Sequence, residues 1–218
     1  IGAQVAPLRS RLEALIAEGD VAASEVRKRV RMLPQAARTM PTGVFETIAA
    51  GTLKRRRVAI RYAARSTAET TERTISPQRL VHYRDNWYVD AWCHLRDGLR
   101  KFAIDAIVEA RLTDQKAKPV DLREVEREFN SGYGIFSGTK LQWAKLRFAP
   151  SRARWIAQER WHPQQRGRLE SDGSYVLELP YTDTRELMMD ILKYGADVRV
   201  LGPRDLADTV AAEIRRMA

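Results

Sequence analysis

Hydrophobic residues recur at helical spacing in the first part of the chain, up to about residue 53. Apolar positions three and four residues apart form one side of a helix, and breaks fall at Glu18-Gly19-Asp20 and at Pro34. The pattern predicts a helical linker over residues 1–53. A helix-turn-helix DNA reader is the less favoured alternative, because no short turn leads into a polar recognition helix.

The period changes to strict alternation from residue 54 onward, which is typical of strands. Pro77 interrupts one of these runs and favours a sheet edge or a bend there. Turn residues such as Arg96-Asp97-Gly98 separate the runs. Five short antiparallel strands in so few residues predict a small β-barrel of SH3 or Sm type over residues 54–120. The expected strands cover residues 58–62, 74–83, 87–94, 99–104 and 108–113.

The remaining sequence predicts a connector over residues 121–143 and a second folded unit over residues 144–218. The Gly132, Gly134 and Gly138 stretch is interpreted as linker, because no lysine follows at the offset of a phosphate-binding loop. Strand and helix patterns then alternate in the order βαββαβ, the ferredoxin-like unit, before a terminal helix. The whole chain is therefore expected to belong to the α+β class.

Charge is concentrated in one part of the chain. The net charge is +10, and residues 54–101 hold 12 basic and 5 acidic side chains, whereas residues 144–218 hold 13 and 11. A local excess of this kind is the footprint of a polyanion site. A uniformly basic protein is the alternative.

Composition also narrows the class of protein. No apolar run approaches the ~20 residues that span a bilayer, and no secretory signal pattern is present. Cys93 is the single cysteine, which excludes an internal disulfide and fits a cytoplasmic setting. The chain begins at Ile1 rather than Met and is expected to be a fragment.

Arginines dominate the candidate contacts, because a guanidinium group binds phosphate through two hydrogen bonds and stacks on bases. Histidine and serine side chains add donors, and tyrosine rings add stacking surfaces. The predicted nucleic-acid-binding residues are Tyr62, Arg73, Ser76, Arg79, His82, Tyr88, His94, Arg96 and Arg100. The alternatives are salt bridges of Arg73 and Arg100 with Asp90 or Asp105, a surface turn at His94, and burial of the tyrosines.

Strand alternation sorts some of these side chains. Trp87 and Cys93 fall on the apolar face of their strand and are expected in the core, whereas Tyr88 and His94 face the other way. In the second unit the weaker candidates are Arg152, Arg154, Arg166 and Arg168.

No catalytic set is evident, so the protein is not expected to be an enzyme. The three histidines lack metal-ligand spacing, and neither a Gly-x-Ser-x-Gly nor a Walker pattern is present. Asp90 and Asp105 are a weak candidate for a nuclease pair. No cofactor and no metal are expected.

An ordered set of residues resembles a known family. Residues 54–113 resemble a WYL domain, whose Trp-Tyr-Leu triplet is Trp87-Tyr88-Val89 here. Residues 144–217 resemble the C-terminal extension of such domains, and residues 5–53 are similar to the helical linker that follows a winged helix-turn-helix. The matching positions are Tyr62, Arg73, Pro77, Leu80, Val81, Arg100, Phe102, Asp105 and Ile107, then Trp161-His162-Pro163, Gln165, Asp172-Gly173-Ser174, Tyr194-Gly195, Pro203 and Leu206.

The resemblance implies a bacterial transcriptional regulator of a DNA-damage or stress response. Its WYL domain would sense single-stranded DNA, and its extension would support a homodimer. Double-stranded DNA would bind through an N-terminal domain that precedes residue 1. A sensor of a small anion such as a nucleotide, and a protein-interaction module, are the alternatives.

Overall fold

The computed structural model describes residues 38–65, 67–129, 132–136, 138 and 140–217. The helical pattern expected over residues 1–37 lies outside the described residues. The chain divides into two compact units, residues 1–125 and 126–218. A search of the described helices found none long and apolar enough to cross a membrane.

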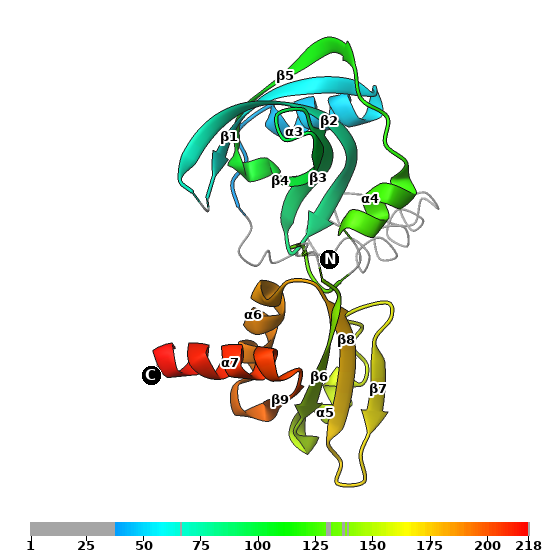
Figure 1. Ribbon diagram of the computed structural model, residues 1–218, viewed down its shortest axis with the longest axis vertical. Helices are drawn as coiled ribbons and strands as arrows, with labels where there is room; N and C mark the ends of the chain where they lie inside the picture. Colours follow the sequence, from blue (N-terminus) through cyan, green and yellow to red (C-terminus); the bar gives the residue numbers. More distant parts are fainter. Residues whose placement is uncertain (1–37, 66, 130–131, 137, 139, 218) are drawn as a thin grey trace, which may run out of the picture. The chain divides into compact units, whose positions relative to one another are not determined.

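In its described part, the first unit is a five-stranded antiparallel sheet with one helix packed against it (Figure 1). The strands lie in the order β4-β3-β2-β1-β5, so β2 is central and β4 and β5 form the edges. The elements are α3 (Val44–Leu53), β1 (Arg56–Ala64), β2 (Glu69–Tyr83), β3 (Asn86–Cys93), β4 (Gly98–Ala103), η1 (Ile104–Ala106) and β5 (Ile107–Lys116).

One face of this sheet, here called the core face, carries the hydrophobic cluster. Trp87 packs against that cluster, and Cys93 is fully buried within it. The prediction that both side chains belong to the core is therefore confirmed. Val44 and Ile48 of α3 join the same cluster, so this helix, which the sequence assigned to the linker, closes the core of the first sheet.

Pro77 lies inside the central strand rather than at a sheet edge. The register shifts between Pro77 and Arg79, which leaves Gln78 as an extra residue in β2. A bulge accommodates the missing proline donor and bends the strand. The expected bend is confirmed, and the expected edge position is wrong because β1 and β3 flank β2 on both sides.

The second unit is a four-stranded antiparallel sheet in the order β7-β8-β6-β9 (Figure 1). Side chains from three helices join its buried core, which uses one face of the sheet. The elements are β6 (Gln142–Phe148), α5 (Pro150–Ile156), β7 (Arg166–Leu169), β8 (Tyr175–Tyr181), α6 (Thr184–Tyr194), η2 (Gly195–Asp197), β9 (Val198–Gly202) and α7 (Arg204–Met217), with α4 (Leu122–Phe129) before them.

The glycine-rich segment packs closely instead of serving as an open linker. The Tyr133 amide donates to the Pro180 carbonyl at 2.9 Å, and the Ile135 amide donates to buried Glu186. Gly134 has a φ of +92°, and a Cβ there would lie 2.1 Å from Glu186 Oε2. The segment is therefore closely packed at Gly134, where both the backbone conformation and the neighbouring side chain require glycine, and its assignment as a connector stays a prediction.

The predicted α+β class is confirmed by two antiparallel sheets packed with helices. The βαββαβ element order of the second unit is also confirmed. Three parts of the sequence interpretation stay predictions. They are the SH3 or Sm barrel for the first unit, the ferredoxin-like fold for the second, and the domain boundaries at residues 53, 120 and 143.

Candidate nucleic-acid interface

The cross-strand register separates the predicted site residues between two faces of the first sheet. Arg73 pairs with Ile60, and Arg100 pairs with Ala91, so both lie on the core face. Ser76 pairs with Trp92 on the opposite face, here called the outer face. The nine residues do not form one surface. Tyr62, Arg73, His82 and Arg100 belong to the core face, and Ser76, Arg79, Tyr88 and His94 to the outer face.

Arg73 lies over two aromatic rings where the core face reaches solvent. Its guanidinium carbon is 5.8 Å from the ring centres of both Tyr62 and Phe102, which contact each other edge to face. Its Nε donates to Thr71 Oγ1 at 2.9 Å, and no described carboxylate pairs with it. Burial raises the pKa of Tyr62. The Arg73 guanidinium group therefore packs against two aromatic rings and keeps N–H donors that can bind an anion.

Arg100 and His82 occupy the same face in different ways. Arg100 is exposed, and its guanidinium donates to the Leu99 carbonyl at 2.6 Å. His82 packs against Trp87 with ring centres 4.8 Å apart. The alternative salt bridges of Arg73 and Arg100 with Asp90 or Asp105 do not form in the structure. The Arg100 side chain is exposed, whereas His82 supports the edge of the core.

Arg79 is held in a buried ion pair rather than offered to a ligand. Its Nε and Nη2 donate to Asp90 Oδ2 at 3.0 and 2.8 Å, and Lys101 Nζ lies 3.7 Å from Oδ1. Asp90 is fully buried, and this burial raises the pKa of its carboxyl group against the opposing effect of Lys101 and Arg79. The geometry favours a structural role for Arg79.

Asp105 forms a second buried ionic centre beside Tyr62. Its side chain is 2% exposed, pairs with Arg65, and lies 3.8 Å from Arg38. The Arg38 amide also donates to Asn86 Oδ1 at 3.1 Å. These contacts fix residue 38, at the start of the described chain, to the sheet. Asp90 and Asp105 are each neutralised by cations, and no group of metal ligands occurs among the described residues, which gives no support to a nuclease pair.

A second cluster of polar and cationic side chains lies on the outer face. Ser76 Oγ is 2.9 Å from His94 Nε2 and accepts a hydrogen bond from the Lys118 amide at 2.8 Å. The Lys118 ammonium group lies 3.3 Å from the centre of the Trp92 ring. Burial first, and then the nearby Arg57 and Lys118 charges, lower the pKa of His94. Ser76 is fully buried, so only His94 and Lys118 of this cluster can reach a ligand.

In the basic run after α3, Lys54 is the exposed C-cap of the helix, and the three arginines that follow it contact the strands. Arg55 donates to Gln78 Oε1 at 2.8 Å, Arg56 pairs with Asp114, and Arg57 donates to Gln115 Oε1 at 2.9 Å.

The last two of the nine predicted site residues lie apart from both clusters. Arg96 is exposed in the turn after β3, and Tyr88 is half-buried on the outer face.

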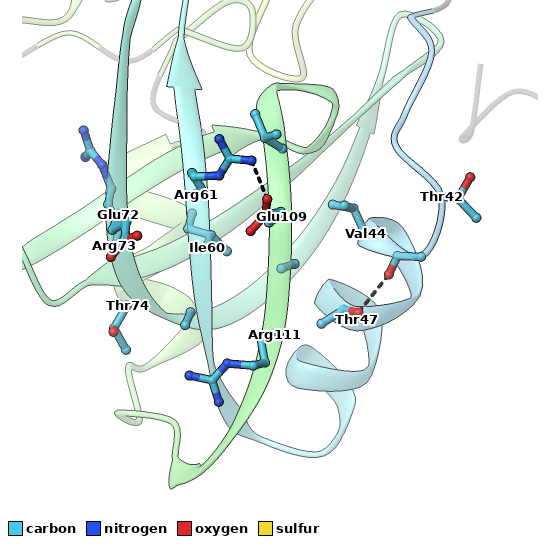
Figure 2. A pocket seen from close by; sticks show the side chains of 14 residues that line it. Thr42, Val44, Thr47, Ile60, Arg61, Glu72, Arg73, Thr74, Glu109 and Arg111 are labelled. Atoms are coloured by element: carbon cyan, nitrogen blue, oxygen red, sulfur yellow. Dashed lines mark hydrogen bonds and ion pairs between the residues drawn. The ribbon is translucent and has the colours of Figure 1, made fainter.

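A shallow groove of about 750 Å³ runs along β1 and β5 and the start of α3 (Figure 2). Arg61 forms an ion pair with Glu109 here, and Arg111 projects beside them. The Arg73 side chain leaves β2 on the side away from Arg61 (Figure 2). Glu72, Arg73 and Thr74 of β2 also line this groove, so its side chains carry both signs of charge.

Lys118 and Phe102 lie in these clusters but were not among the nine residues predicted from the sequence. Lys118 follows the last strand with no periodic signal, and only the fold brings it to Trp92. Phe102 alternates with Arg100 along β4, so its position beside the arginines could have been read from strand spacing.

Comparison with known proteins identifies both units. Residues 43–112 match the WYL domain family, and residues 140–218 match the WCX domain family. Protein PafC of Mycobacterium tuberculosis is 33% identical over 156 residues, which are 71% of this chain and 48% of PafC. The DNA-binding transcriptional repressor CapW of Escherichia coli is 32% identical over 85 residues, 39% of this chain and 28% of CapW. The chain thus spans about half the length of PafC.

A solved structure, the proteasome accessory factor B/C of Arthrobacter aurescens, is 22% identical and aligns over 83% of this chain and 28% of its own, with a TM-score of 0.36. That score is too low to carry a fold assignment, so the assignment rests on the two domain matches and the sequence relatives. The ordered WYL and WCX matches and the named relatives together show that this chain belongs to the family of WYL-domain bacterial regulators.

Proposed function

We propose that this chain is the effector-sensing part of a transcriptional regulator and that single-stranded DNA binds the core-face rim around Arg73 and Arg100. The observation that carries the proposal is the Arg73 guanidinium, held over the Tyr62 and Phe102 rings without a carboxylate partner among the described residues. Phosphate binding would use the guanidinium donors, and a base would stack against the half-buried Tyr62.

The mechanism is a shift between two arrangements of the regulator. A ligand changes such an equilibrium only by its difference in affinity for the two states. The proposed setting is a cytoplasmic homodimer in a DNA-damage or stress response, whose further domain reads double-stranded DNA. The resemblance to WYL regulators supports this setting, together with the repressor name of the CapW relative. No catalytic activity is proposed.

The test is fluorescence anisotropy of a labelled 12-nucleotide single strand across a range of salt concentrations. Two lost phosphate contacts reduce the slope of log K against log salt by about 1.4, so Arg73→Gln/Arg100→Gln is expected to bind more weakly with a shallower slope. The matched control is Arg215→Gln/Arg216→Gln, which removes the same charge from exposed positions of α7. An equal loss in both variants would contradict a site at the core-face rim.

A small anionic ligand is the second candidate, and the outer-face cluster favours it. His94 and Lys118 place two nitrogen donors close together, with Lys118 held over the Trp92 ring, which suits the phosphate of a nucleotide. Saturable binding of mononucleotides that is no tighter for longer strands would select this alternative. If charge reversal at Arg73 and Arg100 leaves strand binding unchanged, a protein-interaction module becomes the better interpretation.

A further inference from the structure

The second sheet has a face that its hydrophobic core does not use. Ala144, Leu146 and Phe148 of β6 point into the core with helices α5, α6 and α7. The alternate residues Trp143 and Arg147 are exposed on the opposite face. Strand pairing extends this face across all four strands, and we call it the open face. Its members are Trp143, Lys145, Arg147, Arg166, Arg168, Val176, Glu178, Pro180 and Arg199.

Three arginines of the open face lie in one row across the sheet. Arg168 pairs with Val176, Val176 with Arg147, and Arg147 with Arg199. Neighbouring strands are about 4.8 Å apart, so the row extends over about 14 Å. Arg147 and Arg199 are directly opposite each other, an arrangement that destabilises a sheet. A negatively charged partner would relieve this repulsion.

Some of these cations are already neutralised and others are not. Arg147 pairs with Asp172, Arg168 with Glu170 at 2.7 Å, and Lys145 with Glu178 at 3.1 Å. Arg166 and Arg199 form no ion pair with a described carboxylate. The open face therefore keeps unneutralised positive charge at both edges of the sheet, on β7 and β9.

An aromatic ring lies beside the row. Trp143 is 38% exposed, and the Arg166 guanidinium carbon is 4.8 Å from its ring centre. A guanidinium group supported by an aromatic ring presents its own flat surface, on which a nucleobase stacks. The open face thus combines arginines that can bind phosphates with a surface on which a base can stack. This combination suits a single-stranded nucleic acid whose bases are turned toward the protein.

We propose that the open face of the WCX domain is a second binding surface for single-stranded nucleic acid, separate from the core-face rim of the first unit. Arg147, Arg168 and Arg199 bind consecutive backbone phosphates, and Trp143 with Arg166 stacks one base. Self-association through this face would set like charges against each other, which favours a polyanion over a second copy of the chain.

The test uses the full chain and a labelled 15-nucleotide oligothymidylate, with an oligouridylate arm that identifies the preferred sugar. Arg166→Gln/Arg168→Gln/Arg199→Gln is expected to lower affinity and, because two of its arginines bind phosphates, to reduce the salt slope by about 1.4. The control Arg204→Gln/Arg215→Gln/Arg216→Gln removes the same charge from exposed positions of α7 and should leave both values unchanged. Equal effects of the two triples, or none from the first, would overturn the proposal.

Trp143→Ala tests the stacking part and is expected to weaken oligothymidylate about ten-fold. If this variant binds normally and polyglutamate displaces the strand as well as oligothymidylate does, the open face is a surface for acidic proteins and the proposal is wrong. Thermal unfolding of each variant checks that the second unit remains folded.

Arg73→Gln/Arg100→Gln separates this inference from the proposed function. If strand binding is lost only in that double variant, the core-face rim binds DNA and the open face does not. If it is lost only in the open-face triple, the reverse holds.

Discussion

Replacement of Gly134 by alanine tests the close packing of the glycine-rich segment. Its φ of +92° is a conformation in which a Cβ costs about 1–2 kcal/mol. The new Cβ would also lie 2.1 Å from Glu186 Oε2 and displace that carboxylate from the Ile135 amide. A hydrogen bond to a charged group contributes about 1.5–3 kcal/mol. The expected loss is therefore about 3–4 kcal/mol of unfolding free energy.

The matched control is Gly195→Ala. Gly195 also has positive φ, +54°, but a Cβ there meets no atom within 4 Å. Only the backbone cost applies to this variant, about 1–3 kcal/mol, because its ψ of −127° lies outside the left-handed helical region. Both replacements lie in the second unit, so their difference isolates the clash with Glu186.

Urea unfolding followed by tryptophan fluorescence measures both variants, because Trp161 stacks on Tyr133 next to the altered position. For a unit of about 100 residues, the Gly134 variant should lower Tm by at least about 12 °C. In a Glu186→Ala background, which already lacks this hydrogen bond, Gly134→Ala should cost no more than its backbone part, so the two losses are not additive. If Gly134→Ala costs no more than Gly195→Ala, the packing described for this segment is wrong.

The remaining predictions concern the first unit. Ile75→Ala should cost about 2–5 kcal/mol of unfolding free energy, because Ile75 is fully buried in the core, and an unchanged urea midpoint would contradict that placement. In the folded state, burial and the Arg57 and Lys118 charges lower the pKa of His94. The unfolded state therefore binds more protons than the folded state just below the usual His pKa. Stability should fall as pH decreases from about 7 to 5. His94→Asn should flatten this part of the pH profile of the urea midpoint, and a slope that persists in the variant would assign the effect to another group.

Strand alternation predicted much of the fold because it depends only on local chemistry. It placed Trp87 and Cys93 in the core, and the structure agrees. The partner of Arg79 was not predictable, because it depends on the register between β2 and β3 and on the extra residue Gln78. By contrast, Arg73 and Ser76 lie three residues apart before the bulge, so strand alternation alone puts them on opposite faces.

Long-range contacts account for the other differences. Lys118 reaches Trp92 only because the chain returns to the outer face after β5. The glycine-rich segment suggested a linker because composition does not reveal that Glu186, some fifty residues later, packs against it. Both outcomes needed the tertiary fold.

The bulge at Gln78 also limits how this sequence can change over time. Before it, β2 directs Ile75 and Pro77 to the core face, and after it Leu80 packs against the same core while Arg79 meets Asp90. Loss of Gln78 itself would leave Arg79 opposite Asp90 and Leu80 opposite Val89, because the extra residue takes no place in the ladder. Loss of a paired residue would instead move the later side chains of β2 to the other face. We therefore expect a deletion within β2 to be tolerated best at Gln78, where it removes the bulge and the hydrogen bonds of Gln78 with Arg55 and the Lys118 carbonyl.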